Sequence, residues 1–162
     1  KALICIGLVA VAGCARKPPQ VLPPDPVGAE TTTPSTTPAG IVPGSQADFV
    51  ANISSDTIYF DTDRYNIDDA DRATLQSQVQ WLQRYPNVRI TVEGHCDERG
   101  TRDYNIALGE RRANAAKNYL ASLGIDPARI NVVSYGKERP IALGSDEASW
   151  AQNRRAVTVT IQ

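Results

Sequence analysis

The sequence predicts an α/β (α+β) sandwich, in which two main helices pack on one mixed β-sheet in the element order β-α-β-α-β-β. Short β-branched runs that alternate with polar residues are typical of strands, and two stretches between them have the apolar spacing of helices. Strands joined by helices favour parallel neighbours with the helices packed on the sheet. The net charge of −1 gives no sign of non-specific nucleic-acid binding.

The first strand is expected at residues 57–60, where β-branched and aromatic side chains cluster. Asp68 or Asp69 can cap the helix that follows, and Pro86 ends it. Its apolar stripe recurs at positions i, i+4 and i+7, and consists of Leu75, Val79 and Leu82. Residues 88–92 alternate as a second strand.

A second helix is expected over about residues 103–123, with Gly124 as its C-terminal stop. Its apolar face consists of Ala113, Ala116, Leu120 and Leu123. Gly109 lies inside this helix at a cost of about 1 kcal/mol, which indicates a close backbone approach by the sheet or by a ligand.

The C-terminal part predicts a third strand at residues 131–135, a helical turn at 147–152 and a last strand at 156–162. Val157, Val159 and Ile161 alternate with threonines in that last strand. A loop precedes it where the other strands have a full helix, so this strand can run antiparallel. Strand order does not follow from the sequence.

Residues 1–13 are predicted to be a secretory signal peptide. An apolar run of 12 residues follows Lys1, whereas a membrane-spanning helix needs about 20, so the run fits the h-region of a signal. We expect its start to be missing, because the chain contains no methionine. A buried core helix is the alternative, but the proline-rich stretch that follows offers nothing for it to pack on.

The end of this run, Val11-Ala12-Gly13-Cys14, resembles the bacterial lipobox, in which signal peptidase cuts before the cysteine and the thiol is acylated. The resemblance implies a lipid anchor on Cys14 and, because Ala15 follows, sorting to the outer membrane with the domain in the periplasm. Several acyl chains hold a protein stably without a transmembrane helix. With Cys5 removed and Cys14 acylated, Cys96 has no partner for an internal disulfide.

Residues 14–46 are predicted to be a tether that carries the lipidated cysteine. Eight of the 11 prolines lie in this segment, together with a threonine-rich run at 31–38. It has no apolar periodicity, so we expect an extended, disordered linker. The folded domain is expected to occupy residues 47–162.

Polar and charged residues concentrate in residues 93–112, which we call the junction segment because it links a predicted strand to a predicted helix. His95 and Cys96 are neighbours on a strand and should point to opposite faces, which disfavours a Cys–His dyad. A zinc site needs three or four ligands, and no carboxylate is distinguished as a proton donor. We therefore expect a binding site, with no catalysis, metal or cofactor.

The junction segment suits a ligand that carries both a positive and a negative group. Asn105, Leu108 and Arg112 fall at i, i+3 and i+7 and share one helix face, while Asp97 precedes the helix. A guanidinium and a helix N-terminus favour a carboxylate, and Asp97 favours a cation, so an amino-acid head group would satisfy both ends. The alternative is that Asp97 pairs with Arg112 or only caps backbone, an interaction worth roughly 0–1 kcal/mol at a surface.

The motifs GHCDERGT (94–101) and YNIALGERRA (104–113) resemble the peptidoglycan-binding signature of the OmpA C-terminal-like family. Three further runs, at 59–63, 134–140 and 149–157, resemble it as well, and the likeness spans residues 55–161. The resemblance implies the sandwich fold named above. It also implies non-covalent binding of the peptidoglycan stem peptide through its meso-diaminopimelate.

By motif position, Asp97 corresponds to the aspartate that holds the ammonium of diaminopimelate, and Arg112 to the arginine that holds its carboxylate. The other positions that the resemblance places around the ligand are Phe60, Asp61, Thr101, Asn105 and Leu108. Members of the family usually carry Ala or Thr where Cys96 stands. This thiol could therefore oxidise or cross-link two copies.

Lipid-anchored members of the family also join the Tol system, where they meet TolB and help to hold the outer membrane to the wall during division. The resemblance implies TolB and other Tol proteins as partners. Two other functions remain open from the sequence. One is a cell-wall hydrolase that uses acidic residues, and the other is an adaptor that binds only TolB.

Overall fold

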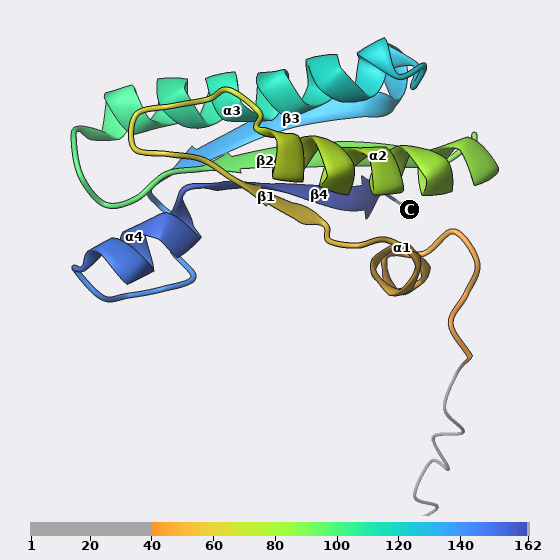
Figure 1. The fold of residues 1–162 in the computed structure, drawn as a ribbon, viewed down its shortest axis with the longest axis horizontal. Coiled ribbons are helices and arrows are strands. Elements are labelled where there is room, and N and C mark those ends of the chain that lie inside the picture. The colour runs from red at the N-terminus through yellow and green to blue at the C-terminus, as the bar shows by residue number, and fades with distance from the viewer. Residues whose placement is uncertain (1–39, 162) are drawn as a thin grey trace, which may run out of the picture. The chain divides into compact units, whose positions relative to one another are not determined.

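A computed structural model describes residues 40–161, so the predicted signal peptide, Cys14 and most of the predicted tether lie outside the described residues (Figure 1). None of the helices between residues 40 and 161 is both long and apolar enough to cross a membrane. The elements in chain order are α1 (Gln46–Asn52), β1 (Thr57–Tyr59), α2 (Asp69–Arg84), β2 (Arg89–His95), α3 (Arg102–Ser122), the short 3-10 helix η1 (Pro127–Arg129), β3 (Ile130–Gly136), α4 (Glu147–Asn153) and β4 (Arg155–Ile161).

The predicted element order is confirmed, and the helix α1 and the short helix η1 are additions to it. Helix α1 was not predicted, because among its seven residues only Phe49 is buried, which leaves no apolar stripe. The expected turn at 147–152 is the complete helix α4, and the Asp146 side chain caps it by accepting a hydrogen bond from Ser149 N at 2.9 Å. Strand β2 extends beyond its predicted end to His95, because it pairs there with β3.

The four strands form one mixed sheet in the order β1-β4-β2-β3. β2 and β3 are parallel and are joined through α3, whereas β4 is antiparallel to both of its neighbours. The antiparallel direction considered for the last strand is therefore confirmed. Figure 1 shows α2 and α3 on the same face of the sheet. Because the last strand lies between β1 and β2, it brings the C-terminal residues beside the junction segment.

The hydrophobic core lies between that face of the sheet and the two long helices. The predicted α2 stripe is buried, and so are Ala113, Ala116 and Leu120 of α3. On β4, however, Thr158 and Thr160 face the helices, while Val157 and Val159 lie half-buried on the other face of the sheet. Thr158 is accommodated because its hydroxyl lies 2.9 Å from Gln78 Oε1 inside the core.

Helix α3 approaches strand β2 with no side chain between them. A Cβ atom added to Gly94 would lie 1.8 Å from the carbonyl oxygen of Gly109, and one added to Gly109 would lie 2.4 Å from Ser134 Oγ. The close approach indicated by Gly109 is thus made by the sheet. It places the first half of α3 against the end of β2, where the junction segment leaves the sheet.

We expect Gly94→Ala to destabilise the protein by about 3 kcal/mol, the upper end of the cost of overpacking, since the backbone oxygen that blocks the new methyl group cannot rotate away. The measurement is the free energy of urea unfolding, followed by circular dichroism. Gly40→Ala is the matched control, because nothing lies within 4 Å of its Cβ position. Equal stability of the two variants would contradict the close approach.

Candidate ligand-binding site

The junction segment leaves the sheet through a pairing irregularity and re-enters regular structure at a helix cap. The register of β2 against β3 shifts between Gly94 and His95, and Cys96 N then donates to Gly136 O at 2.8 Å. Gly100 has a φ of +84°, a conformation that suits glycine. Thr101 caps α3 by accepting a hydrogen bond from Tyr104 N at 3.3 Å. The loop is thereby fixed at both ends.

A cavity of about 220 Å³ opens between this loop and α3. Its lining consists of Thr62, Asp63, Cys96, Asp97, Arg99, Gly100, Tyr104, Asn105, Leu108 and Arg112. Four predicted site residues are therefore brought together, and the shared helix face is buried: Asn105 is 2%, Leu108 4% and Arg112 0% exposed.

The other three predicted residues lie around this cavity and not in its lining. Phe60 packs in the core, with its ring centre 5.2 Å from the guanidinium carbon of Arg112. Asp61 contributes its backbone carbonyl to Arg112, and Thr101 serves as the helix cap. Phe60 and Asp61 also line a neighbouring hollow of about 390 Å³. These three residues support the walls of the cavity.

Arg112 is held by three backbone carbonyl groups. Its Nε donates to Arg64 O at 2.8 Å, Nη1 to His95 O at 2.8 Å and Nη2 to Asp61 O at 3.1 Å. A guanidinium has five N–H groups, so two stay available. Burial lowers the pKa of Arg112, yet it keeps its proton, as arginines in proteins do. Because carbonyls carry no net charge, its positive charge can still attract an anion.

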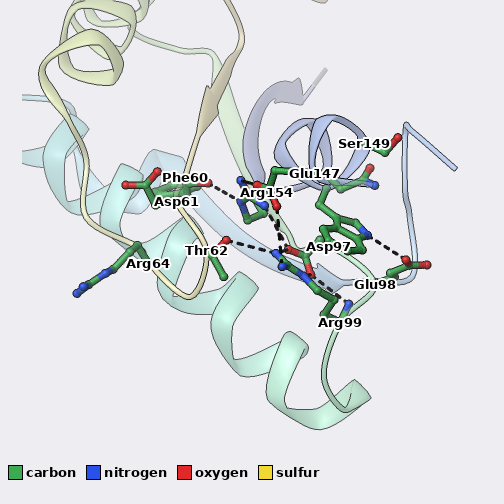
Figure 2. Close-up of polar contacts among 12 residues, drawn as sticks. Phe60, Asp61, Thr62, Arg64, Asp97, Glu98, Arg99, Glu147, Ser149 and Arg154 are labelled. Carbon is green, nitrogen blue, oxygen red and sulfur yellow. Dashed lines mark hydrogen bonds and ion pairs between the residues drawn. The ribbon is translucent and has the colours of Figure 1, made fainter. Parts of the chain in front are cut away.

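Asp97 is held by two other arginines. Arg99 donates from Nη2 to Oδ2 at 2.6 Å and from Nε to Oδ1 at 3.1 Å, and Arg154 Nη1 lies 3.5 Å from Oδ2 (Figure 2). The Arg99 backbone N–H also donates to Oδ1 at 3.1 Å. Burial would raise the pKa of Asp97, but these hydrogen bonds and charges outweigh it and lower the pKa. No ion pair joins Asp97 to Arg112 in residues 40–161, so the alternative pairing considered above does not form.

Helix α4 supplies an outer ring of contacts around Asp97. The Arg99 guanidinium lies 4.2 Å from the centre of the Trp150 ring, and Trp150 Nε1 donates to Glu98 Oε1 at 2.9 Å. Arg154 donates to Glu147 Oε1 at 2.7 Å and to Phe60 O at 2.9 Å. None of these α4 contacts was predicted. The motif runs at 59–63 and 149–157 contain several of the residues involved, so they were the sequence features that could have indicated these contacts.

His95 and Cys96 point to opposite faces, as strand alternation predicted. The His95 ring stacks on Tyr135 with centres 5.5 Å apart, whereas Cys96 lines the cavity and lies 3.4 Å from Asn105 O. Burial, with the charges of Arg155 and Arg139, lowers the pKa of His95 to about 4. Glu93 Oε2 is 3.6 Å from Nε2, too far for the hydrogen bond that would offset this.

The Cys96 thiol is buried, and burial raises its pKa, so the thiolate needed for oxidation or cross-linking is disfavoured. Burial therefore disfavours the oxidation and cross-linking that the sequence predicted for this thiol. Among residues 40–161, no group of three or more His, Cys, Asp and Glu side chains is placed to hold a metal ion.

Comparisons with known proteins agree with this architecture. Residues 59–154 match the OmpA family. The chain is 51% identical over 151 residues to the peptidoglycan-associated lipoprotein of Rhizobium meliloti (strain 1021), covering 93% of this chain and 81% of the relative. It is 48% identical over 117 residues to that of Pseudomonas aeruginosa, covering 72% and 69% of the two chains.

Among solved structures, the crystal structure of the peptidoglycan-associated lipoprotein from Burkholderia pseudomallei is similar, with a TM-score of 0.65 and 47% identity over 70% of this chain and 93% of the other. The C-terminal domain of Helicobacter pylori MotB (TM-score 0.61, 22% identity, 66% of this chain and 84% of that one) shares the fold alone.

The fold and the cavity thus define an OmpA-like α+β domain with a polar pocket beside a helix N-terminus. The chain belongs to the OmpA family, and within it to the group of the peptidoglycan-associated lipoproteins.

His95 should make stability depend on pH. Its pKa is about 4 in the folded protein and near 6.5 when unfolded, so the unfolded chain binds the proton first as the pH falls. We expect stability to drop by up to about 1.4 kcal/mol per pH unit below 6.5, levelling off near pH 4. Urea unfolding at several pH values would measure this slope. His95→Gln should lack this contribution, and parallel curves for the two proteins would contradict the assignment.

Proposed function

We propose that this protein binds the diaminopimelate-containing stem peptide of peptidoglycan non-covalently and so tethers the outer membrane to the cell wall. The observation that carries the proposal is the convergence of Asp97, Asn105, Leu108 and Arg112 on one cavity. The printed names of its relatives, about 50% identical over most of the chain, support peptidoglycan as the wall component.

The cavity offers separate groups to the two charges of the ligand. Arg112 offers the ligand carboxylate its positive charge and the two N–H groups that do not bond the three carbonyls. Asp97 offers an ionised carboxylate to the ammonium, and Leu108 an apolar contact to the methylene chain between them. Asn105 fixes the loop, because its Nδ2 donates to Arg99 O at 2.7 Å and to Thr101 O at 3.0 Å.

The attachment to the membrane is proposed to run through the N-terminal segment. Residues 1–13 would be removed as the signal, Cys14 would carry the acyl chains, and residues 14–46 would connect the outer membrane to the periplasmic domain. In an extended polyproline-like form such a tether reaches roughly 100 Å. The lipoprotein names of the relatives support association with the cell envelope.

TolB and other Tol proteins are the proposed protein partners, through which the tether would take part in cell division and envelope integrity. We propose binding without turnover. The pocket supports this reading because its one histidine neighbour is neutral at physiological pH and points away from the cavity. No observation favours the hydrolase.

We expect Asp97→Ala to weaken binding to purified peptidoglycan sacculi at least about 10-fold, since a hydrogen bond to a charged group contributes about 1.5–3 kcal/mol. Cosedimentation would measure the affinity, with free diaminopimelate as competitor. Asp69→Asn is the control, because that side chain is 97% exposed on α2. Arg112→Ala should also weaken binding, but it leaves three carbonyls without their donor, so its stability must be measured alongside.

The other outcomes of this experiment distinguish the proposed function from its two alternatives. Wild-type affinity in Asp97→Ala would refute the site assignment. Failure of the wild-type protein to sediment with sacculi, while it still captures TolB, would favour the adaptor. Release of soluble fragments from the sacculi would favour the hydrolase.

We expect Cys14→Ser to abolish incorporation of labelled palmitate and to shift the protein from the membrane fraction to the soluble fraction, because no acyl chain can then be attached. Cys96→Ala is the matched control, since it removes a buried thiol that has no part in anchoring. Membrane association of Cys14→Ser equal to that of Cys96→Ala would contradict the lipid anchor.

A further inference from the structure

We propose that the Arg99 side chain occupies the place of a ligand ammonium on Asp97, and that ligand binding moves Arg99 off Asp97 toward Glu147, while its guanidinium stays against the Trp150 ring. This inference rests on the proposed function, because it describes how the same pocket admits the ammonium of diaminopimelate.

Both carboxylate oxygens of Asp97 already face a guanidinium. Arg99 holds both carboxylate oxygens, at 2.6 and 3.1 Å, and Arg154 lies 3.5 Å from one of them. The residue is only 7% exposed. An ammonium donates up to three hydrogen bonds and has to lie close to the carboxylate to make them. The place that the Arg99 guanidinium occupies is the one that gives an ammonium both oxygens at once.

The charge balance leads to the same conclusion. Asp97 is one carboxylate between the guanidiniums of Arg99 and Arg154, and the charge of Arg112 acts on it as well. A third cation added beside these two would be repelled by them. If one guanidinium withdraws, the ammonium replaces it and the number of cations around Asp97 stays the same.

Arg99 is the guanidinium that can withdraw. The Arg154 side chain is 8% exposed and donates to Phe60 O at 2.9 Å and to Glu147 Oε1 at 2.7 Å, which fixes it in place. The Arg99 side chain is 39% exposed and lies at the rim of the cavity. Figure 2 shows both arginines directed at Asp97 from different elements.

A second position for Arg99 already lies within reach. Its Nη1 is 3.9 Å from Glu147 Oε2, its Nη2 donates to Thr62 Oγ1 at 3.3 Å, and its guanidinium carbon is 4.2 Å from the centre of the Trp150 ring. Glu147 bonds Arg154 through Oε1, which leaves Oε2 available. The Arg99 backbone N–H can keep its bond to Asp97 Oδ1, so the loop stays folded.

The exchange lowers the affinity of the pocket for a cationic group. A ligand with an ammonium has to displace Arg99 from Asp97, whereas a ligand with carboxylates alone leaves the Arg99–Asp97 pair intact. Arg99 therefore acts as an internal competitor of the ammonium. Removing it should strengthen the binding of the cationic group and leave the binding of the carboxylate unchanged.

The test compares meso-diaminopimelate with pimelate, which has the same carbon chain and carboxylates but no ammonium. Dissociation constants are measured by NMR titration of the purified chain. We expect Arg99→Ala to bind diaminopimelate about fivefold more tightly than the wild type, the upper end for a partly exposed ion pair, and to bind pimelate equally. Arg102→Ala is the control, because it removes the same charge from a side chain that is 68% exposed.

A second variant tests the position to which Arg99 moves. Glu147→Gln removes the charged acceptor of Arg99 and also weakens the bond to Arg154, so its effect on diaminopimelate binding should be about twofold larger in the wild type than in Arg99→Ala, where only the Arg154 contact is changed. Additive effects would overturn the exchange. Unfolding midpoints are measured for every variant, and Arg99→Gln replaces Arg99→Ala if the latter does not fold.

The outcomes separate this inference from the proposed function. Weaker or unchanged diaminopimelate binding by Arg99→Ala would overturn the exchange, and so would an equal gain for pimelate, which would indicate only a wider entrance. A wild-type protein that binds neither sacculi nor diaminopimelate would overturn the proposed function itself.

Discussion

The buried guanidinium of Arg112 is the interaction on which both the domain and its pocket depend. It joins helix α3 to the end of β2 through His95 O, and to the loop after β1 through the carbonyls of Asp61 and Arg64. A buried charge is costly unless hydrogen bonds satisfy it. These carbonyls satisfy three of its five N–H donors without neutralising the charge. Arg112 therefore serves two purposes: it holds the walls of the cavity in place, and it keeps a positive potential inside.

The strand order turns this local arrangement into a pocket. Because β4 lies between β1 and β2, helix α4 and Arg154 come to lie beside Asp97. The contact of Gly94 with Gly109 lets α3 approach closely enough for its buried face to reach the same place. Segments around residues 60–64, 96–112 and 147–154 thus meet at one carboxylate, although they lie far apart in the sequence.

Features that depend on local periodicity could be predicted from the sequence, whereas features that depend on strand order could not. The α2 stripe and the shared face of Asn105, Leu108 and Arg112 follow from the helical repeat. The sequence could not show that Arg154 lies beside Asp97, because the position of β4 decides this. The sequence likewise could not show that the Thr158 side chain faces the core. That direction depends on a hydrogen-bond partner 80 positions away, Gln78.

The pairing of Asp97 with Arg99 also bears on how strongly the pocket could hold a ligand. In the proposed exchange one ion pair replaces another, so the loss of the Arg99–Asp97 pair offsets part of the free energy that the ammonium contributes, and the ligand is held less tightly than it would be without Arg99. A single weak attachment does not hold the membrane, but many copies of the protein in one membrane that bind the same wall hold it firmly. A tether built in this way can release and rebind locally as the wall is remodelled. An internal competitor at the binding carboxylate would therefore suit a structural attachment that must remain reversible.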